Sequence, residues 1–185
     1  MSAPFPRAGA VAMAGALSGA LVGLWLSYGL DAFHDMGEVG NTVSIVSIYG
    51  GPGIFYGIIV GAVLRRPLNF QLWRWGAWIL CAALSYAAAL ILALWLYGSR
   101  QDLALMNFLA GGAAGSLGAA LLSGASAALF ASFRNLRRAI DSVLAGGLIG
   151  LALPAVLASN LLAMIVFLAV WQGAYAVAST QGGSR

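Results

Sequence analysis

Residues 39–64 have the sequence VGNTVSIVSIYGGPGIFYGIIVGAVL, in which 26 consecutive positions carry no charged side chain. About 20 apolar residues are enough for a helix to cross the hydrocarbon core of a bilayer, at a rise of about 1.5 Å per residue. The polar and apolar residues do not alternate as they do in a strand of an outer-membrane barrel. Because a lone spanning segment must satisfy its own backbone hydrogen bonds, this stretch predicts a transmembrane helix.

The rest of the chain has the same character, with 62% hydrophobic and only 8% charged residues and a mean hydropathy of +0.93. Four further uncharged runs occupy residues 8–30, 75–99, 103–133 and 142–184. Soluble globular chains carry about 25% charged residues, so a soluble protein is excluded. We therefore predict an all-α integral membrane protein that forms one transmembrane domain over residues 1–185.

The last run is too long for a single span, since its 43 residues would make a helix of about 65 Å, roughly twice the thickness of the hydrocarbon core. Pro154 lacks a backbone N–H, and Ser159 and Asn160 are residue types that cap helices, so we expect the run to divide near them. The prediction is a compact bundle of six helices with Gly/Ala-rich packing, or of five if the run stays whole. The six spans are expected at about 8–30, 42–64, 75–98, 103–132, 141–157 and 160–179.

The basic residues predict how the chain is threaded through the membrane. All nine are arginines, and seven of them fall between spans on one side: Arg7, Arg65, Arg66, Arg74, Arg134, Arg137 and Arg138. Only Arg100 clearly falls on the other side. Arginine-rich loops stay in the cytoplasm, so we expect a multi-pass protein of the bacterial inner (plasma) membrane with a cytoplasmic N-terminus. No residues remain to build a basic soluble domain, so nucleic acid is excluded as a partner.

Glycines recur at every fourth position in the first two spans, at Gly15, Gly19 and Gly23 and at Gly53, Gly57 and Gly61. Strips of small residues let transmembrane helices approach closely. If the two neighbours run antiparallel, the strips lie at similar depths, and we expect them to pack face to face. The fourth span, FLAGGAAGSLGAALLSGASAALF over residues 108–130, is also rich in small residues, which predicts a central helix with neighbours on several sides.

Pro52 lies inside the second span and removes the backbone donor that would bond to the carbonyl of Ile48. We therefore expect the helix to kink near residues 49–51. A re-entrant pore bend is the alternative, because freed backbone groups can line a cavity. The same glycine-rich stretch is not a phosphate-binding loop, since that motif requires a lysine and the chain has none.

Sequence motifs for catalysis and for cofactors are missing. A retinal pigment needs a lysine and bis-histidine haem ligation needs two histidines, whereas His34 is the single histidine. The segment SGASAALF at residues 123–130 resembles the serine motif of rhomboid intramembrane proteases, in which Ser126 would be the nucleophile. Those proteases take their base from a histidine on a later helix, and no histidine follows Ser126 here. We expect no cofactor, and an enzyme is the least favoured class.

The most polar segment is DAFHDMGE at residues 31–38, which spaces four side chains at i, i+3, i+4 and i+7: Asp31, His34, Asp35 and Glu38. On a helix these side chains share one face, where they could bind a divalent metal, relay protons or recognise a cationic cargo. Gly37 and Gly40 disfavour a helix. A solvated loop after the first span is therefore the alternative.

Inside the predicted spans the polar residues are uncharged, which argues against an ion-coupled pump with a deep carboxylate. They include Ser85, Tyr86, Ser123 and Gln172. Four others are candidate ligand-binding residues of a cavity between the second span and the late helices: Tyr49, Tyr56, Asn107 and Asn160. The alternative is that such groups bond within their own helices.

In size and in its small-residue first span, AGAVAMAGALSGAL over residues 8–21, the chain resembles the substrate-binding S components of energy-coupling factor vitamin transporters. The resemblance implies six helices, a substrate site near the outer side and a first helix that faces a transport partner. It covers no motif from which a binding residue could be assigned.

Two classes of function therefore remain. The first is a small-molecule transport or substrate-binding component in the lipid bilayer. The second is an accessory or scaffolding subunit, without a ligand of its own, that packs against other membrane subunits or a second copy of itself. A cavity among the polar residues favours the first class, and a filled bundle with a large apolar side face favours the second.

Overall fold

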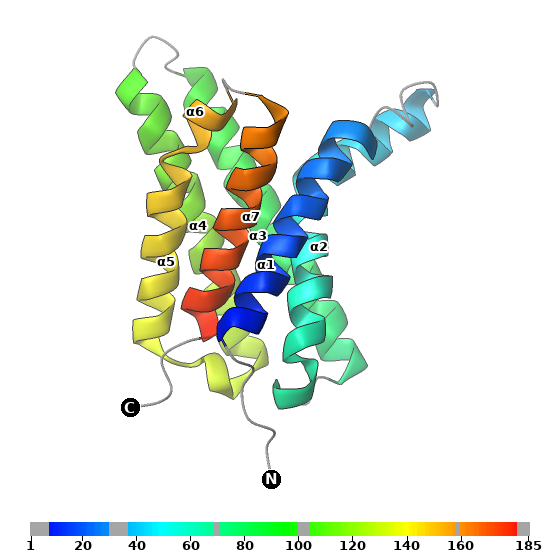
Figure 1. Ribbon diagram of the computed structural model, residues 1–185, viewed down its shortest axis with the longest axis vertical. Helices are drawn as coiled ribbons and strands as arrows, with labels where there is room; N and C mark the ends of the chain where they lie inside the picture. Colours follow the sequence, from blue (N-terminus) through cyan, green and yellow to red (C-terminus); the bar gives the residue numbers. More distant parts are fainter. Residues whose placement is uncertain (1–7, 30–36, 69–70, 100–103, 158–159, 181–185) are drawn as a thin grey trace.

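The computed structural model describes residues 8–29, 37–68, 71–99, 104–157 and 160–180, and these are almost entirely helical (Figure 1). The elements in chain order are α1 (Ala8–Leu24), the π-helix η1 (Trp25–Gly29), α2 (Gly37–Leu68), α3 (Leu72–Ser99), α4 (Ala104–Leu129), the 3-10 turn η3 (Ala131–Phe133), α5 (Leu136–Gly150), α6 (Leu153–Leu157) and α7 (Leu161–Thr180). No strand occurs among these residues. The predicted all-α class is confirmed.

Most of these helices are long and apolar enough to cross a bilayer. The five that qualify by length and composition are Gly40–Arg65, Leu72–Leu96, Leu105–Leu129, Leu136–Val156 and Leu162–Thr180. Helix α1 is shorter, with 17 residues, and η1 extends it by five. The chain is therefore a multi-pass membrane protein.

The long last run divides into two helical arms, as the six-helix prediction requires. A turn follows α5 at residues 151–152, and α6 carries Pro154 in its first turn. Asn160 caps the second arm, since its Oδ1 accepts a hydrogen bond from the backbone N–H of Ala163 at 3.0 Å. Pro154 thus lies near the end of the first arm, and the capping asparagine begins the next.

Helices α5 and α2 both begin five residues before the spans predicted from the uncharged runs. For α5 the reason is Asn135, whose Oδ1 accepts from the backbone N–H of Arg138 at 3.2 Å and caps the helix. α2 begins at Gly37, whose φ of 60° is a left-handed conformation that glycine adopts without strain. Both helices begin in more polar sequence, before the apolar residues start. The uncharged runs therefore do not predict where these helices begin.

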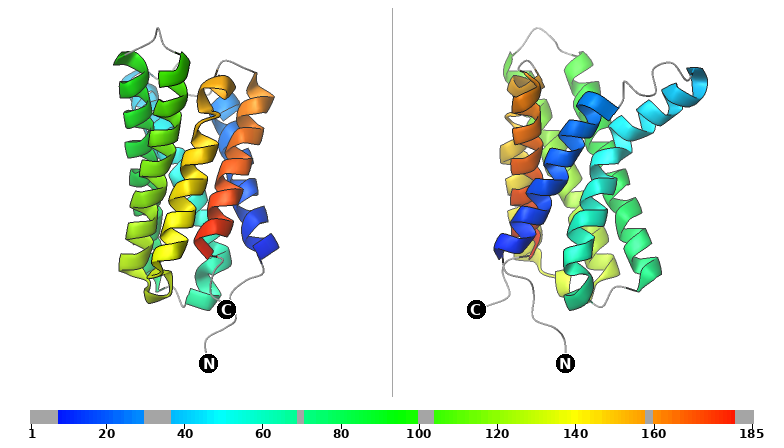
Figure 2. Two further views of the ribbon diagram at one scale, coloured as in Figure 1. Left: turned by 90° about the vertical axis from the view of Figure 1, so that its left-hand side faces the viewer. Right: turned by 45° about the vertical axis from the view of Figure 1, so that its right-hand side comes forward.

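The helices lie side by side (Figure 2), and the contacts between neighbouring helices close into a ring. Around this ring α1 packs on α2, α2 on α3, α3 on α4, α4 on α5, α5 on α7, and α7 on α1. Because α4 lies in the ring between α3 and α5 it is not central, but the expected neighbours on several sides are present, since it contacts α3, α5 and α6. Its small residues serve two neighbours, since Gly111 and Gly115 approach the backbone of α5 and Gly118 approaches α3, while Leu109 and Leu121 are exposed.

The glycine strips of α1 and α2 pack against other partners than those expected. The backbone of α7 lies so close that a Cβ would overlap this helix at Gly15, Gly19 and Gly23. The backbone of α3 lies equally close to Gly53 and Gly57 of the second strip, and the side chain of Trp75 lies against Gly61. The expectation that the two strips face each other is wrong. A strip of glycines identifies a face that some neighbour approaches, but it does not identify the neighbour.

Helix α2 runs without interruption through Pro52, so the re-entrant pore bend is wrong. Its first part leans away from the bundle at an angle to the rest of the helix (Figure 2, right). This bend agrees with the kink expected around Pro52, which cannot donate a hydrogen bond to the carbonyl of Ile48.

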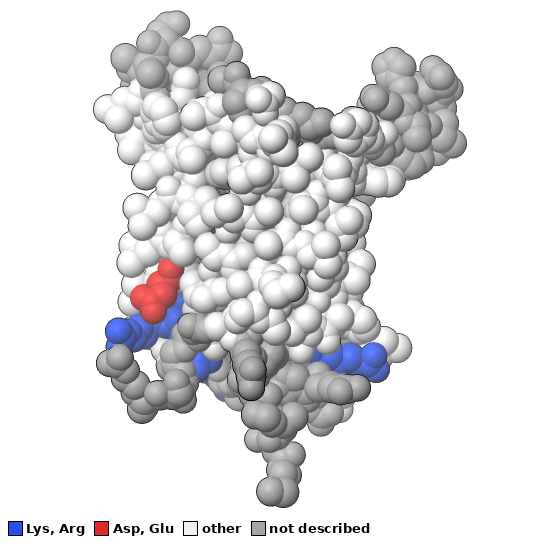
Figure 3. Space-filling model, in the orientation of Figure 1, with Lys and Arg blue, Asp and Glu red and all other residues white. Residues whose placement is uncertain are grey.

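Charged side chains gather at one end of the bundle, which we call the arginine end (Figure 3). The described arginines of this end lie where α2 ends, where α3 begins and around the start of α5: Arg65, Arg74, Arg134, Arg137 and Arg138. α1 also begins and α7 also ends there (Figure 1). Arg7 and Arg100 lie outside the described residues. We call the opposite end of the ring the far end, and the cytoplasmic side of the protein stays a prediction.

Candidate functional site

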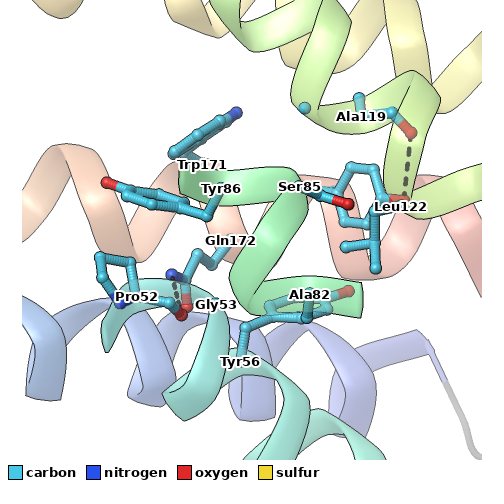
Figure 4. A pocket seen from close by; sticks show the side chains of 12 residues that line it. Pro52, Gly53, Tyr56, Ala82, Ser85, Tyr86, Ala119, Leu122, Trp171 and Gln172 are labelled. Carbon is cyan, nitrogen blue, oxygen red and sulfur yellow. Dashed lines mark hydrogen bonds between the residues drawn. The ribbon is translucent and has the colours of Figure 1, made fainter. Parts of the chain in front are cut away.

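The ring encloses a central cavity of about 50 Å³, bordered by α2, α3, α4 and α7 (Figure 4). Its wall is formed by Pro52, Gly53, Tyr56, Ala82, Ser85, Tyr86, Gly118, Ala119, Leu122, Trp171, Gln172 and Tyr175. A buried water needs about 10–15 Å³ by this measure, so the cavity has room for a few water molecules or for one small polar group.

Gln172, near the middle of α7, is the most polar group of this wall. Its Nε2 donates a hydrogen bond to the backbone oxygen of Pro52 at 3.3 Å, which ties α7 to α2 across the ring (Figure 4). Its Oε1 has no hydrogen-bond partner among the described residues. The side chain is only 5% exposed, so a strong acceptor is held away from solvent at the cavity wall.

Tyr175 is held on the wall one turn further along α7. Its hydroxyl lies 3.2 Å from Ser123 Oγ and 3.5 Å from the backbone oxygen of Ala119, so α4 positions it. Its ring meets that of Tyr56 edge-on, with centroids 5.7 Å apart. The two tyrosines thus form the floor of the cavity toward the arginine end.

Below this floor an aromatic plug, made of Trp78, Phe130 and Phe133, fills the ring. The three ring centroids lie 6.0–6.1 Å apart, and Tyr56 stacks on Trp78 at 6.4 Å. The turn η3 brings two of the rings together, because the N–H of Phe133 bonds to the carbonyl of Phe130 at 3.1 Å. All three side chains are buried, so the cavity is closed toward the arginine end.

Toward the far end the ring widens into a larger space, the far chamber, of about 480 Å³. Its wall is almost wholly apolar and comes from η1, α2, α3, α4, α6 and α7: Leu26, Ile48, Tyr86, Leu90, Ala93, Leu94, Asn107, Ala110, Gly111, Leu153, Pro154, Val156, Met164, Phe167 and Leu168. Asn107 is its one polar amide, and Oδ1 of that amide is buried without a hydrogen-bond partner among the described residues.

The pair Tyr86 and Trp171 stands between the two spaces. The ring centroids are 5.5 Å apart and the rings are tilted by 48°. Tyr86 borders both spaces, and a third space of about 40 Å³ is bordered by this pair and by Leu90, Ala93 and Phe167 of the far chamber. Because they share wall residues, the three spaces adjoin one another between the far chamber and Gln172, and we call this row of spaces the path.

The four predicted ligand-binding residues do not form one site. Tyr56 borders the central cavity and Asn107 borders the far chamber. Asn160 is exposed and caps α7, and Tyr49 borders neither space. Their role in ligand binding stays a prediction.

Sequence reasoning left Tyr86, Trp171, Gln172 and Tyr175 out of the candidate site. The available signal was a carboxamide in the middle of an apolar helix of 20 residues, where a polar group must find a partner. Trp171 and Tyr175 lie one residue before and three residues after it, so they share its region of the helix. The face of α7 that points into the ring depends on the neighbouring helices, and the sequence alone does not show how these are arranged.

The predicted metal cluster lies mostly outside the described residues, since Asp31, His34 and Asp35 are not among them. Glu38 is exposed at the start of α2. Within the described part of the chain, no group of three or more His, Cys, Asp or Glu side chains is placed to hold a metal ion. The hydroxyl of Ser126 donates a hydrogen bond to the carbonyl of Leu122 in its own helix.

Comparison with protein-family models, with curated proteins and with solved structures finds no match for this chain. The chemistry of the site therefore rests on its own residues. Among the described residues that line the three spaces none is charged, and their polar groups are hydroxyls, amides and an indole. Such walls suit an uncharged molecule, because a buried charge without a partner costs far more than a buried amide.

Proposed function

We propose that this membrane protein is the substrate-binding component of a small-molecule transport process and takes an uncharged molecule from the far end of the ring. The observation that carries the proposal is the row of adjoining spaces from the far chamber to Gln172, which the aromatic plug closes toward the arginine end. The proposal rests on this geometry and on general properties of ligand sites.

The size and lining of the path support binding of a small molecule. Ligand pockets commonly measure about 300–1,000 Å³ and have apolar walls with a few placed polar groups, and the far chamber of about 480 Å³ has this character. A substrate-binding protein must hold its ligand on one side of the membrane without a leak to the other. The buried rings of Trp78, Phe130 and Phe133 meet that need.

The alternative is an accessory subunit without a ligand, and one surface feature favours it. A shallow groove between α1 and α7 on the outside of the ring is lined by small residues such as Ala12, Ala16, Gly173 and Ala174. Close packing of a partner helix would suit such a groove. An accessory subunit would not need the interior spaces to bind a ligand. Testing whether those spaces hold a molecule therefore separates the two functions.

Filling the far chamber provides that test. Ala93 is 7% exposed and borders the far chamber, so Ala93→Phe places a ring in the path. We expect the small molecules that copurify with the native protein, identified by mass spectrometry, to be lost from this variant. The matched control is Ile91→Phe on the same helix, where the native side chain is 56% exposed.

The control should keep the copurifying molecules, and both variants should elute as single species in size-exclusion chromatography. If the wild-type protein and Ala93→Phe carry the same set of small molecules in the same amounts, the interior path does not bind ligand and the transport proposal is wrong. The accessory reading would then account for the fold.

A further inference from the structure

Gln172 holds a hydrogen-bond acceptor that no described residue of the protein uses. The carbonyl of Pro52 can only accept a hydrogen bond, so the carboxamide atom that lies 3.3 Å from it must be the nitrogen. This fixes the orientation of the amide. Oε1 is therefore the atom left without a partner among the described residues, in a side chain that is 5% exposed.

A buried acceptor that lacks a donor is costly, and native proteins keep few of them without a reason. Gln172 borders the central cavity, whose volume of about 50 Å³ admits a hydroxyl or amide group but not a ring system. The group that completes the site must therefore be small and must carry an O–H or N–H. It must also be uncharged, because the cavity wall offers no ion partner.

The rest of such a ligand would lie along the path toward the far end. Past Tyr86 and Trp171 the far chamber offers a much larger volume, about 480 Å³, whose wall is mostly aliphatic and aromatic apart from the amide of Asn107. An apolar body suits this chamber, and a polar one would lose its hydration there. The central cavity therefore suits the polar end of a ligand, and the far chamber suits its apolar body.

We infer that the ligand is an uncharged amphiphile that places a hydroxyl or amide N–H on Oε1 of Gln172 and its apolar body in the far chamber. This inference rests on the proposed function and specifies the chemical class of the substrate. Gln172 recognises the head, and the Tyr86–Trp171 pair contacts the ligand where the head meets the body.

The test compares two molecules that differ in the donor alone. The protein is reconstituted in phosphatidylcholine nanodiscs and photolabelled with an alkan-1-ol that carries a diazirine, and the labelled peptides are mapped by mass spectrometry. Decan-1-ol and decyl methyl ether compete with the probe at equal mole fractions in the bilayer. We expect decan-1-ol to protect the peptides around Tyr86 and Trp171 at roughly 3- to 10-fold lower concentration than the ether, the range of one neutral hydrogen bond.

Replacing the acceptor should abolish this preference. In Gln172→Leu the ratio between alcohol and ether should fall to about 1, whereas Gln71→Leu, the same change at an exposed position just before α3, should keep the wild-type ratio. If Gln172→Leu does not fold, the ratio measured on the wild-type protein decides alone.

Equal protection by alcohol and ether in the wild-type protein would overturn this inference and leave the proposed function standing. A probe that labels no peptide of the path would also overturn it, since the stated class of ligand would not enter. The proposed function itself stands or falls with the molecules retained by Ala93→Phe, so the two failures are distinguishable.

Discussion

At Gly19 the absence of a side chain lets α1 touch the backbone of α7 beside Leu168. Backbone atoms cannot rotate out of the way as the end of a side chain can, so the contact is set by the size of the residue at position 19. Gly15 lies equally close to the same helix, one turn earlier. Single missing methyl groups thus determine how near two arms of the ring stand.

We expect Gly19→Ala to force α1 away from α7 and to lower the free energy of unfolding by about 1–3 kcal/mol, the usual cost of overpacking. Unfolding in a denaturing detergent, followed by circular dichroism, would measure this loss. The matched control is Gly124→Ala inside α4, where a Cβ meets no atom within 4 Å. That change should be neutral or slightly stabilising, because alanine favours helix over glycine. Equal losses in both variants would contradict the close packing of α1 on α7.

At the scale of single elements, the turn η3 connects α4 to α5 and also helps to close the central cavity toward the arginine end. Phe130 and Phe133 are the buried residues around this turn, and both contact Trp78 of α3. Arg134 donates to the backbone carbonyl of Ala127 and Arg138 to that of Ser132, and these bonds hold the turn in place. Two of the three plug residues therefore belong to a short connection, and its displacement would open the path to the arginine end.

Shortening the plug should open the central cavity from that end. In a Cys81→Ser background, a cysteine introduced at Ala119, on the cavity wall, reports access to a water-soluble thiol reagent. We expect Phe133→Ala to raise its rate of modification from the arginine end at least tenfold, because removing a buried ring leaves a cavity of its own volume. Phe108→Ala, the same change at an exposed position of α4, should leave the rate unaltered. An unaltered rate in Phe133→Ala as well would mean that the plug does not close the path.

At the scale of the whole molecule, the sequence predicted what depends on local chemistry. Uncharged runs gave the helices, and Pro154 with Asn160 gave the division of the last run. The partners of Gly19 and Gly57 were not predictable, because a glycine face is equally suited to any neighbour that the connections allow. The same limit explains why α4 was expected at the centre and why Gln172 was overlooked as a site residue.

The direction of the whole ring in the membrane follows from the arginines, which resist transfer across the bilayer, so the arginine end is expected in the cytoplasm. In the Cys81→Ser background, a membrane-impermeant maleimide should modify Thr42→Cys, near the far end of α2, in intact cells. Ser132→Cys, exposed in η3 at the arginine end, should react only after the membrane is permeabilised. The reverse pattern would contradict the predicted orientation. The far chamber would then open to the cytoplasm, and the protein would load its ligand from inside the cell, so this measurement also decides from which side the substrate enters.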